Sequence, residues 1–306
     1  MPEAAASLDA HALRVVQAIA DQGSLTAAAG ALGYSQPALS QQVKRLEARL
    51  GVALVERVGR RLRLTQAGEV LARHAPAVSS ALQAAAGELD QVRGLRSARV
   101  RLAAFPSASA TLVPRLLAEL AAAHPGIMVT YVEAEPPEAV DAVRHGRADV
   151  ALTFSYPGDL DDPHGASAEG LAVRAIGRDE LRAVLPAGHI AAGAPVELAA
   201  LADENWIAGC PRCRGHLLEV CATAGFAPRI AFETDNFVAV QSLVERGLGV
   251  ALLPRLALES TPQRPGIVVQ PTASGDTRTV HLVTARGASG VPATAVVLSA
   301  LERLAR

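Results

Sequence analysis

Three cysteines in one short segment give this chain its most reactive side chains. Cys210 and Cys213 form a C-x-x-C, the spacing of redox dithiols and of half a zinc site, and Cys221 follows. His216 is the nearest imidazole, so Cys210, Cys213, His216 and Cys221 could combine into a metal site. The odd number of cysteines is unlike a secreted disulfide framework, and no second C-x-x-C exists. We therefore expect reduced thiols lining a loop, with redox or metal sensing as the alternative.

A second group of side chains suits the recognition of nucleic acid. Residues 35–50 predict a helix with Ser35 as its N-cap and Pro37 in its first turn. Apolar residues form a single stripe on this helix, namely Leu39, Val43, Leu46 and Leu50. The opposite face carries amides, hydroxyls and cations without an acid, and such groups read base edges and phosphates in a DNA major groove. An ordinary amphipathic helix with a solvated polar side would show the same pattern.

The elements around this helix favour the DNA-binding interpretation. Apolar spacing predicts two helices upstream, the first ending at Gly23 and the second covering 24–32, so the three helices form a helix-turn-helix. Downstream, residues 54–57 and 61–64 alternate as the short strands of a hairpin wing. Residues 35–65 contain seven bases and two acids, a local charge of +5 in a chain whose net charge is -1. A basic patch on a near-neutral protein is typical of a nucleic-acid-binding surface.

Residues 66–95 predict one long helix with two apolar rows. Each row repeats every seven residues: Leu71, Val78, Ala85 and Val92 in one, and Ala75, Leu82 and Leu89 in the other. Parallel rows favour a helix–helix seam between two subunits. Packing of the same rows on the body of the protein is the alternative. Pro76 should kink or interrupt this helix.

Beyond residue 95 the predicted strands and helices alternate, which indicates an α/β fold with a mostly parallel sheet. Helices are expected at 110–123 and, in a second unit that repeats the pattern, at 216–224. The second unit begins with a strand at 181–185. Residues 266–270 are expected to return to the first unit and 292–306 to form its closing helix.

Six short motifs in the first 70 residues resemble the N-terminal domain of LysR-type transcriptional regulators in order and spacing. They are Gly23-Ser-Leu-Thr-Ala-Ala-Ala, Ser35-Gln-Pro-Ala-Leu-Ser, Arg45-Leu-Glu, Leu50-Gly-Val, Glu56-Arg and Leu64-Thr-Gln-Ala-Gly. Farther along, Phe232-Glu-Thr-Asp-Asn-Phe and Leu248-Gly-Val-Ala-Leu-Leu-Pro254 resemble the second lobe of the family's effector domain. Val55 departs from the family, which often has Phe before Glu-Arg, and this difference concerns the packing of the wing.

The resemblance implies a winged helix-turn-helix DNA-binding domain at 1–65 and a linker helix for dimerisation at 66–95. A two-lobed Rossmann-like effector domain, similar to periplasmic binding proteins, would follow at 96–306. Lobe I would comprise 96–162 and 268–306, and lobe II 163–267. The family also implies a homodimer through the linker helix and a homotetramer on promoter DNA. The residues expected to face double-stranded DNA are Thr26, Ser35, Gln36, Pro37, Ala38, Ser40, Gln41, Lys44, Arg45, Arg57, Arg60, Arg61 and Arg63.

Ligands of open α/β sheets bind beyond the carboxyl ends of the strands, against helix N-termini. This rule selects a set of candidate effector-binding residues: Ser107, Ala108, Ser109, Phe154, Ser155, Cys210, Arg212, Thr234 and Asn236. Arg212 and Arg214 would suit an anionic effector. The serines could equally cap helices, and the arginines could be solvated.

The rest of the sequence argues against other classes of protein. It contains no G-x-S-x-G, P-loop or H-E-x-x-H, so we expect neither an enzyme nor a cofactor. A secretory signal and a membrane-spanning stretch are also missing, which predicts a cytoplasmic protein. The predicted function is a transcription regulator that responds to a small molecule in the cleft between its lobes. The alternative is a redox or metal sensor acting through Cys210, Cys213 and Cys221.

Overall fold

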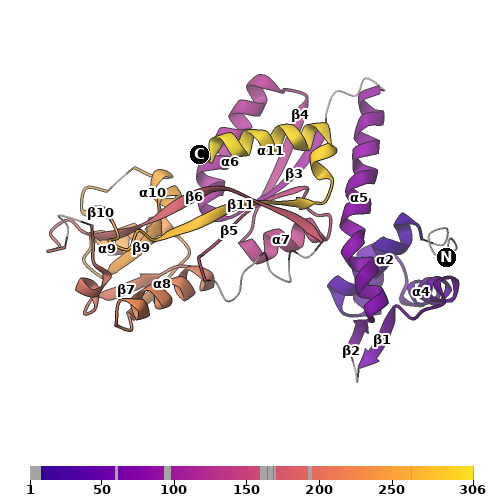
Figure 1. The fold of residues 1–306 in the computed structure, drawn as a ribbon, viewed down its shortest axis with the longest axis horizontal. Helices are drawn as coiled ribbons and strands as arrows, with labels where there is room; N and C mark the ends of the chain where they lie inside the picture. Colours follow the sequence, from indigo (N-terminus) through magenta and orange to yellow (C-terminus); the bar gives the residue numbers. More distant parts are fainter. Residues whose placement is uncertain are drawn as a thin grey trace.

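A computed structural model gives the fold of the protein (Figure 1). The N-terminal unit expected to bind DNA, called the DNA-binding unit below, and a larger two-lobed domain, called the effector domain, lie on either side of the long helix α5, Gln66–Val92. The described residues are 8–58, 61–92, 98–158, 164, 168, 170–191, 195–262 and 264–305.

The DNA-binding unit is a three-helix bundle with a hairpin wing. Its elements are α2 (Ala10–Gln22), α3 (Leu25–Leu32), α4 (Gln36–Leu50), β1 (Val55–Val58) and β2 (Arg61–Leu64). Side-chain oxygens cap each helix start, because Asp9, Ser24 and Ser35 accept hydrogen bonds from backbone N–H groups three residues on. The predicted stripe of α4 is buried at Leu39, Val43 and Leu46. The two strands pair antiparallel, as the alternation predicted.

Helix α5 is fixed to the wing by a close approach at Gly68. A Cβ at this position would lie 2.2 Å from the carbonyl oxygen of Leu54, so only glycine fits. The hydroxyl of Thr65 donates to the carbonyl of Ala53 at 2.7 Å and accepts from the N–H of Gly68. The expected interruption at Pro76 was wrong, because α5 continues through it. Pro76 removes only one N–H, and the packing of α5 on α2 supports the helix there.

Lobe I, as we use the term for the structure, is the part of the effector domain nearest α5 (Figure 1). Three parallel strands form its sheet: β3 (Ala98–Ala104), β4 (Ile127–Glu133) and β5 (Val150–Ser155). Three helices cover them: α6 (Pro106–Ala123), α7 (Pro136–Arg144) and α11 (Pro292–Leu304). Helix α6 begins four residues before the predicted start, because Pro106 suits the first position of a helix. Ser107 and Ser109 therefore lie in its first turn and not in a loop.

Lobe II repeats this arrangement at the other end of the sheet. Its strands are β7 (Asn205–Ala208), β8 (Arg229–Glu233), β9 (Val250–Pro254) and β10 (Ile267–Pro271). Its helices are the short 3-10 helix η2 (Leu198–Leu201), α8 (Pro211–Thr223), α9 (Phe237–Glu245) and α10 (Arg255–Glu259). Helix α8 begins at Pro211, five residues before the predicted start, so Cys213 lies in its first turn. The expectation that residues 266–270 return to lobe I was wrong, since β10 pairs with residues 182–186.

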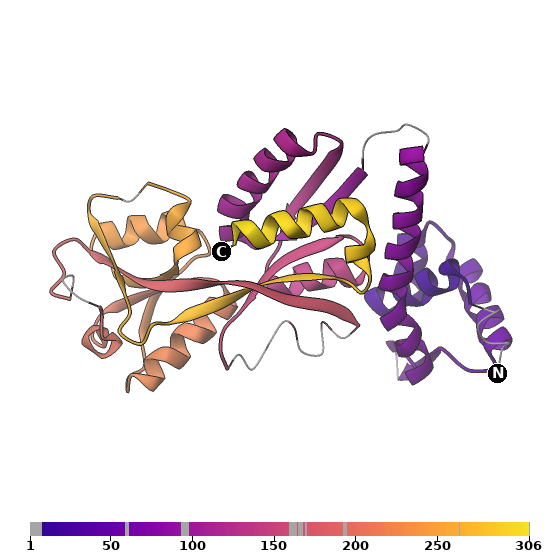
Figure 2. The ribbon, with the colours of Figure 1, turned by 45° about the horizontal axis from the view of Figure 1, so that its top comes forward.

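Two long strands join the lobes into one nine-stranded sheet (Figure 2). They are β6 (Leu171–Pro186) and β11 (Thr277–Ala285), which pair antiparallel. Strand β6 pairs with β11 over residues 171–180 and then with β9 and β10 over 181–186. The sequence had predicted only the second half of β6, because charged residues interrupt the apolar pattern of the first half. The sheet passes from lobe to lobe within β6, and the residue limits of the lobes stay a prediction.

Candidate functional site

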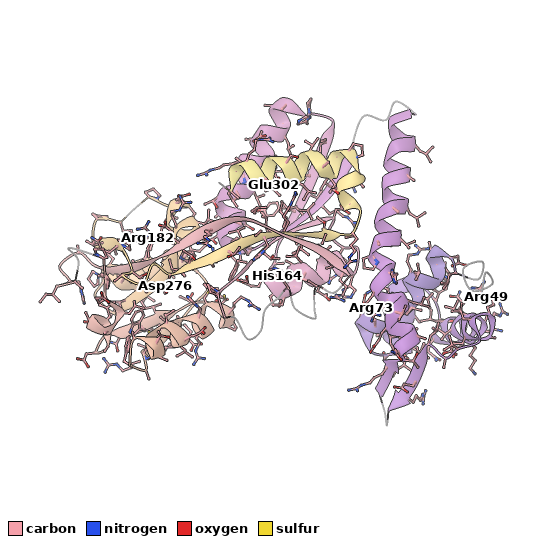
Figure 3. All side chains as sticks on the ribbon, in the orientation of Figure 1. Arg49, Arg73, His164, Arg182, Asp276 and Glu302 are labelled. Carbon is pink, nitrogen blue, oxygen red and sulfur yellow. The ribbon has the colours of Figure 1, made fainter. Side chains whose placement is uncertain are left out.

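Most of the residues expected to face DNA are exposed at the surface of the winged unit. Thr26 of α3 is exposed, as are six residues of the α4 region: Ser35, Gln36, Pro37, Gln41, Lys44 and Arg45. Ala38 and Ser40 on the same helix are half-buried. In the wing, Arg57 and Arg63 are exposed on neighbouring strands. Arg60 and the side chain of Arg61 lie outside the described residues. Figure 3 places Arg49 on the outer side of this unit and Arg73 of α5 at its junction with the effector domain.

The acid of the recognition helix points away from this surface. One carboxylate oxygen of Glu47 accepts hydrogen bonds from the N–H groups of Leu54, at 2.8 Å, and Val55, at 3.2 Å. These bonds hold the start of the wing against α4. Glu47 thus removes its negative charge from the DNA face and sets the distance between helix and wing. One feature of the sequence indicated this role: on α4, Glu47 lies between the apolar stripe and the polar face.

A cavity of about 70 Å³ lies between the lobes, at the carboxyl ends of β3, β5 and β7. Four of the nine predicted effector residues line it: Ser107, Phe154, Cys210 and Thr234. The other side chains at its wall that matter for the chemistry are Glu135, Tyr156, Cys213 and Arg278. The rule that ligands bind beyond the carboxyl ends of strands therefore located the cleft, but it identified only some of the residues that line it.

The remaining predicted residues have other roles in the structure. Ser109 donates to the carbonyl of Ala104 at 3.1 Å, and Ala108 is fully buried in the core of lobe I. Ser155 bonds to His281 at 3.0 Å. Asn236 caps α9 by accepting from the N–H groups of the first turn. Arg212 lies partly buried in the first turn of α8.

A buried ion pair that the sequence did not indicate forms the floor of the cleft. Arg278 of β11 donates twice to Asp179 of β6, at 2.9 and 2.7 Å, and once to the hydroxyl of Ser107 at 2.6 Å. Both charged side chains are almost fully buried. Asp179 also accepts from the N–H of Leu256, at the start of α10. This hydrogen-bond network connects lobe I, through Ser107, and lobe II, through Leu256, to strands β6 and β11.

Aromatic rings enclose the guanidinium of Arg278. Its central carbon lies 4.3 Å from the ring centre of Phe154 and 4.9 Å from that of Phe105. Cation–π contacts of this kind stabilise a desolvated cation. Burial alone would lower the pKa of Arg278, but Asp179 raises it, so the group stays charged. A fixed positive charge therefore borders the cavity.

The two cysteines of the C-x-x-C lie close together in this cavity. The thiol of Cys210 donates to the sulphur of Cys213 across 3.0 Å, and the hydroxyl of Tyr156 donates to the same sulphur across 3.4 Å. The hydrogen bond from Cys210 lowers the pKa of Cys213, and Arg278 acts in the same direction. The same bond and burial raise the pKa of Cys210. Of the two cysteines, Cys213 is therefore the one whose thiolate the site favours.

Cys221 takes no part in this pair. It lies eight residues after Cys213 on α8, about 12 Å along the helix axis, and a disulfide needs Cα atoms within about 7 Å. Burial raises the pKa of Cys221 to about 12. His216 stacks on Tyr156, with ring centres 4.0 Å apart. Among the residues that the structure describes, no group of three or more His, Cys, Asp and Glu side chains could hold a metal ion.

Comparison with known families decides what kind of protein carries this site. Residues 10–69 match the family model "Bacterial regulatory helix-turn-helix protein, lysR family", and residues 93–306 match "LysR substrate binding domain". The chain belongs to the LysR family. This LysR family protein is a DNA-binding transcription regulator and not an enzyme. In the described part of the chain, no helix is long and apolar enough to cross a membrane.

Relatives cover most of the regulator. The "Probable hydrogen peroxide-inducible genes activator" of Mycobacterium avium is 34% identical over 265 residues, which are 83% of this chain and 81% of that protein. The protein of the same name from Streptomyces viridosporus is 29% identical and covers 96% of this chain and 88% of its own. The "Probable HTH-type transcriptional regulator LrrA" of Synechococcus elongatus is 30% identical and covers 82% of each chain.

Solved structures agree with the fold over nearly the whole chain. An OxyR variant of Corynebacterium glutamicum gives a TM-score of 0.59 at 26% identity and covers 97% of this chain and 91% of its own. Full-length CbnR in complex with its target DNA gives 0.55 at 22% identity, with 98% and 100% coverage. The order of winged unit, long helix and two-lobed domain is therefore that of full-length LysR regulators.

Proposed function

We propose that this regulator senses oxidation of the Cys210–Cys213 dithiol and transmits the change to promoter DNA. The observation that supports the proposal most is the 3.0 Å separation of the two sulphur atoms. A disulfide of about 2.05 Å requires them to approach by only about 1 Å. Cys213 accepts hydrogen bonds from both Cys210 and Tyr156, and a thiolate is the form that reacts with an oxidant.

The size of the cavity also favours a small oxidant over a larger effector. Its volume of about 70 Å³ is well below the roughly 300–1,000 Å³ of typical ligand sites. Roughly 10–15 Å³ of cavity volume is enough to hold one water molecule, so the cavity has room for a molecule of the size of hydrogen peroxide. Three donors of Arg278, which could have met an anionic effector, already bond Asp179 and Ser107. We therefore rank thiol oxidation above the small-molecule effector that the sequence favoured.

Two of the relatives reported above are named as hydrogen peroxide-inducible gene activators, which agrees with the proposed chemistry. The cysteine arrangement gives the proposal its specific form. Cys213 and Cys221 are separated by two turns of an intact helix, so the proposed disulfide joins Cys210 and Cys213, within the first turn of α8.

Contacts between the domains offer a route from the cleft to the DNA-binding unit. His145, after α7 of lobe I, contacts Asp21 of α2 at 2.6 Å and Asp141 at 3.0 Å. Gly170, just before β6, packs against the backbone of Arg73 in α5. We propose that a shift of the lobes changes the position of the winged unit through these contacts.

The sensing proposal is tested by DNA binding of the reduced and peroxide-treated protein. An operator duplex is first selected from random sequences with the reduced full-length protein. We expect peroxide to change the affinity of wild type and of Cys221→Ser, with a Cys210–Cys213 disulfide found by mass spectrometry. Cys210→Ser and Cys213→Ser should not respond. A full response by the double variant Cys210→Ser/Cys213→Ser would overturn the proposal and return the cleft to a small-molecule effector.

We also propose that α5 forms the dimer seam and that dimers assemble into a tetramer on promoter DNA. Leu71 packs on the DNA-binding unit and Ala75 is buried, whereas Leu82 and Leu89 are 53% and 58% exposed in the protomer. Leu82→Glu should place a charge in the seam and dissociate the dimer, at a cost of several kcal/mol. Ala81→Glu, on the neighbouring exposed position, is the control. Light scattering measures the mass, and an unchanged mass for Leu82→Glu would locate the seam elsewhere.

A further inference from the structure

Tyr156 connects the two lobes at the cysteine pair. It directly follows β5 of lobe I and is only 5% exposed. Its hydroxyl donates to the sulphur of Cys213, in the first turn of α8 in lobe II, across 3.4 Å. Its ring stacks on His216 of the same helix, with the two ring planes 5° apart. Cys213 and His216 are three residues apart, so they lie on one face of α8 and meet Tyr156 together.

The ring of Tyr156 is held independently of its hydroxyl group. Phe154 of β5 contacts it edge-on, with ring centres 5.6 Å apart, and His216 of α8 covers its face at 4.0 Å. All three side chains line the cavity between the lobes. Removal of the phenol oxygen alone therefore leaves the ring contacts in place. The hydrogen bond to Cys213 can be tested without disturbing the packing between the lobes.

The hydroxyl of Tyr156 is a suitable partner for a thiolate. A hydrogen bond to a charged acceptor is roughly twice as strong as one between neutral groups. The hydrogen bond from Cys210 first, and then Arg278 and Tyr156, lower the pKa of Cys213 against the effect of burial. Burial first, and then the charge of Cys213, raise the pKa of Tyr156, so the donor keeps its proton.

Other groups that act on the charge of Cys213 come from different parts of the fold. Cys210 precedes Cys213 in the same segment, and Arg278 belongs to β11, which joins the two lobes. Glu135 of lobe I acts in the opposite direction, because its charge raises the pKa of Cys213. Among these groups, Tyr156 is the one through which lobe I stabilises the thiolate.

We propose that Tyr156 is a positioning residue of the sensor, whose hydroxyl holds the thiolate of Cys213 and so joins lobe I to lobe II in the reduced protein. This inference rests on the proposed function, in which Cys213 is oxidised. In a disulfide the sulphur is neutral and a weak acceptor, so oxidation weakens the contact with Tyr156. The coupling is reciprocal: a closed cleft favours the thiolate, and loss of the thiolate favours an opened cleft.

The oxidation that weakens this contact balances with hydrogen peroxide as the oxidant. The thiolate of Cys213 attacks one oxygen, so an S–O bond forms, the O–O bond breaks, and the departing hydroxide takes a proton from solvent to become water. The sulphur of Cys210 then attacks Cys213. The S–S bond forms, the S–O bond breaks, and the hydroxyl leaves with the proton of Cys210 as a second water. Two electrons pass from the sulphurs to the peroxide, and Tyr156 keeps its proton throughout.

The first test measures alkylation of Cys213 by iodoacetamide against pH, in the reduced full-length protein. Tyr156→Phe should move the midpoint to higher pH, lower the rate below it about threefold and raise the plateau above it about threefold. The reason is that a thiolate without this donor is less stable but more nucleophilic. A loosened site would not make the two profiles cross.

The matched control is Tyr131→Phe on β4, where the ring is 46% exposed. This variant should follow the wild-type alkylation profile. An unchanged profile for Tyr156→Phe, or a uniform loss of rate at every pH, would overturn the role of the hydroxyl.

The second test measures operator binding by the same variants before and after peroxide treatment. Tyr156→Phe should still form the Cys210–Cys213 disulfide, but its affinity should change less than that of wild type, because the reduced variant already lacks the contact that oxidation weakens. A full response by Tyr156→Phe would overturn the coupling between the lobes. Absence of the disulfide in wild type would overturn the proposed sensor, whereas the alkylation profiles decide the hydrogen bond independently.

Discussion

The DNA-binding surface and the effector cleft are built in opposite ways. Most of the DNA-binding surface comes from one continuous helix, α4, on which Gln36, Gln41 and Lys44 are exposed and the acid, Glu47, is turned to the wing. The cleft is assembled from distant segments, and its hydrogen-bonded residues Ser107 and Arg278 are 171 residues apart in sequence. The charges of Arg278 and Asp179 are buried there. A substitution on the DNA-binding surface can therefore change a single contact, whereas a substitution in the cleft affects several contacts at once.

This difference has an energetic consequence. Charges on the DNA-binding surface are solvated, so their removal costs little stability and affects mainly the complex with DNA. The charges of Arg278 and Asp179 are out of water, and each satisfies the other. Removing one leaves an unpaired buried charge. We therefore expect substitutions in the cleft to affect folding and sensing together, and those on the winged unit to affect DNA binding alone.

The largest effect is expected for Asp179→Ala, which leaves Arg278 buried without its partner and the N–H of Leu256 without its acceptor. The free energy of unfolding should fall by about 3–5 kcal/mol. Glu180→Ala, next in the strand, breaks only the exposed contact with Arg182 and should cost about 0–1 kcal/mol. Urea unfolding measures both variants. Similar losses for the two would remove the energetic distinction between buried and exposed pairs.

A smaller and more selective effect is expected on the DNA-binding surface. Gln41→Ala should weaken operator binding by about 1–3 kcal/mol while leaving scrambled duplex and unfolding unaffected, because we propose that its exposed amide reads a base edge. Arg57→Ala, in the wing, should weaken both duplexes alike, since wing arginines mainly contact phosphate. Fluorescence anisotropy on the two duplexes separates these outcomes. Equal losses on both for Gln41→Ala would exclude base reading by that residue.

The smallest effect is expected for Cys221, the cysteine that takes no part in the Cys210–Cys213 pair. Its folded pKa of about 12 lies above that of a free thiol, about 8.5, so the folded state retains the proton longer. The resulting stabilisation is complete below pH 8.5 or so and is lost as the pH rises toward 12. Cys221→Ala should therefore lose stability less steeply between pH 7.5 and pH 10 than wild type does. Parallel pH curves for the two proteins would contradict the buried, protonated state of Cys221.

The sequence by itself determined the DNA-binding unit almost completely. Its caps, stripe and polar face are local properties of consecutive residues, so Ser35, Leu39 and Gln41 could be placed from helical geometry alone. The alternation of strands and helices also determined the fold class of the effector domain. The helix starts at Pro106 and Pro211 were missed because residues 106–109 and 209–214 were assigned to loops at the strand ends.

Only the tertiary structure decided the composition of the cleft. Arg278 and Asp179 lie in strands that look amphipathic, and nothing in their neighbours indicates that each is almost fully buried against the other. Glu135 reads as the start of a helix, yet it lines the same cavity as Cys210. The physical reason is that burial and pairing across the sheet depend on contacts between distant segments. Residue types and spacing along the chain specify local geometry, and the charge state of these side chains depends on what folding brings beside them.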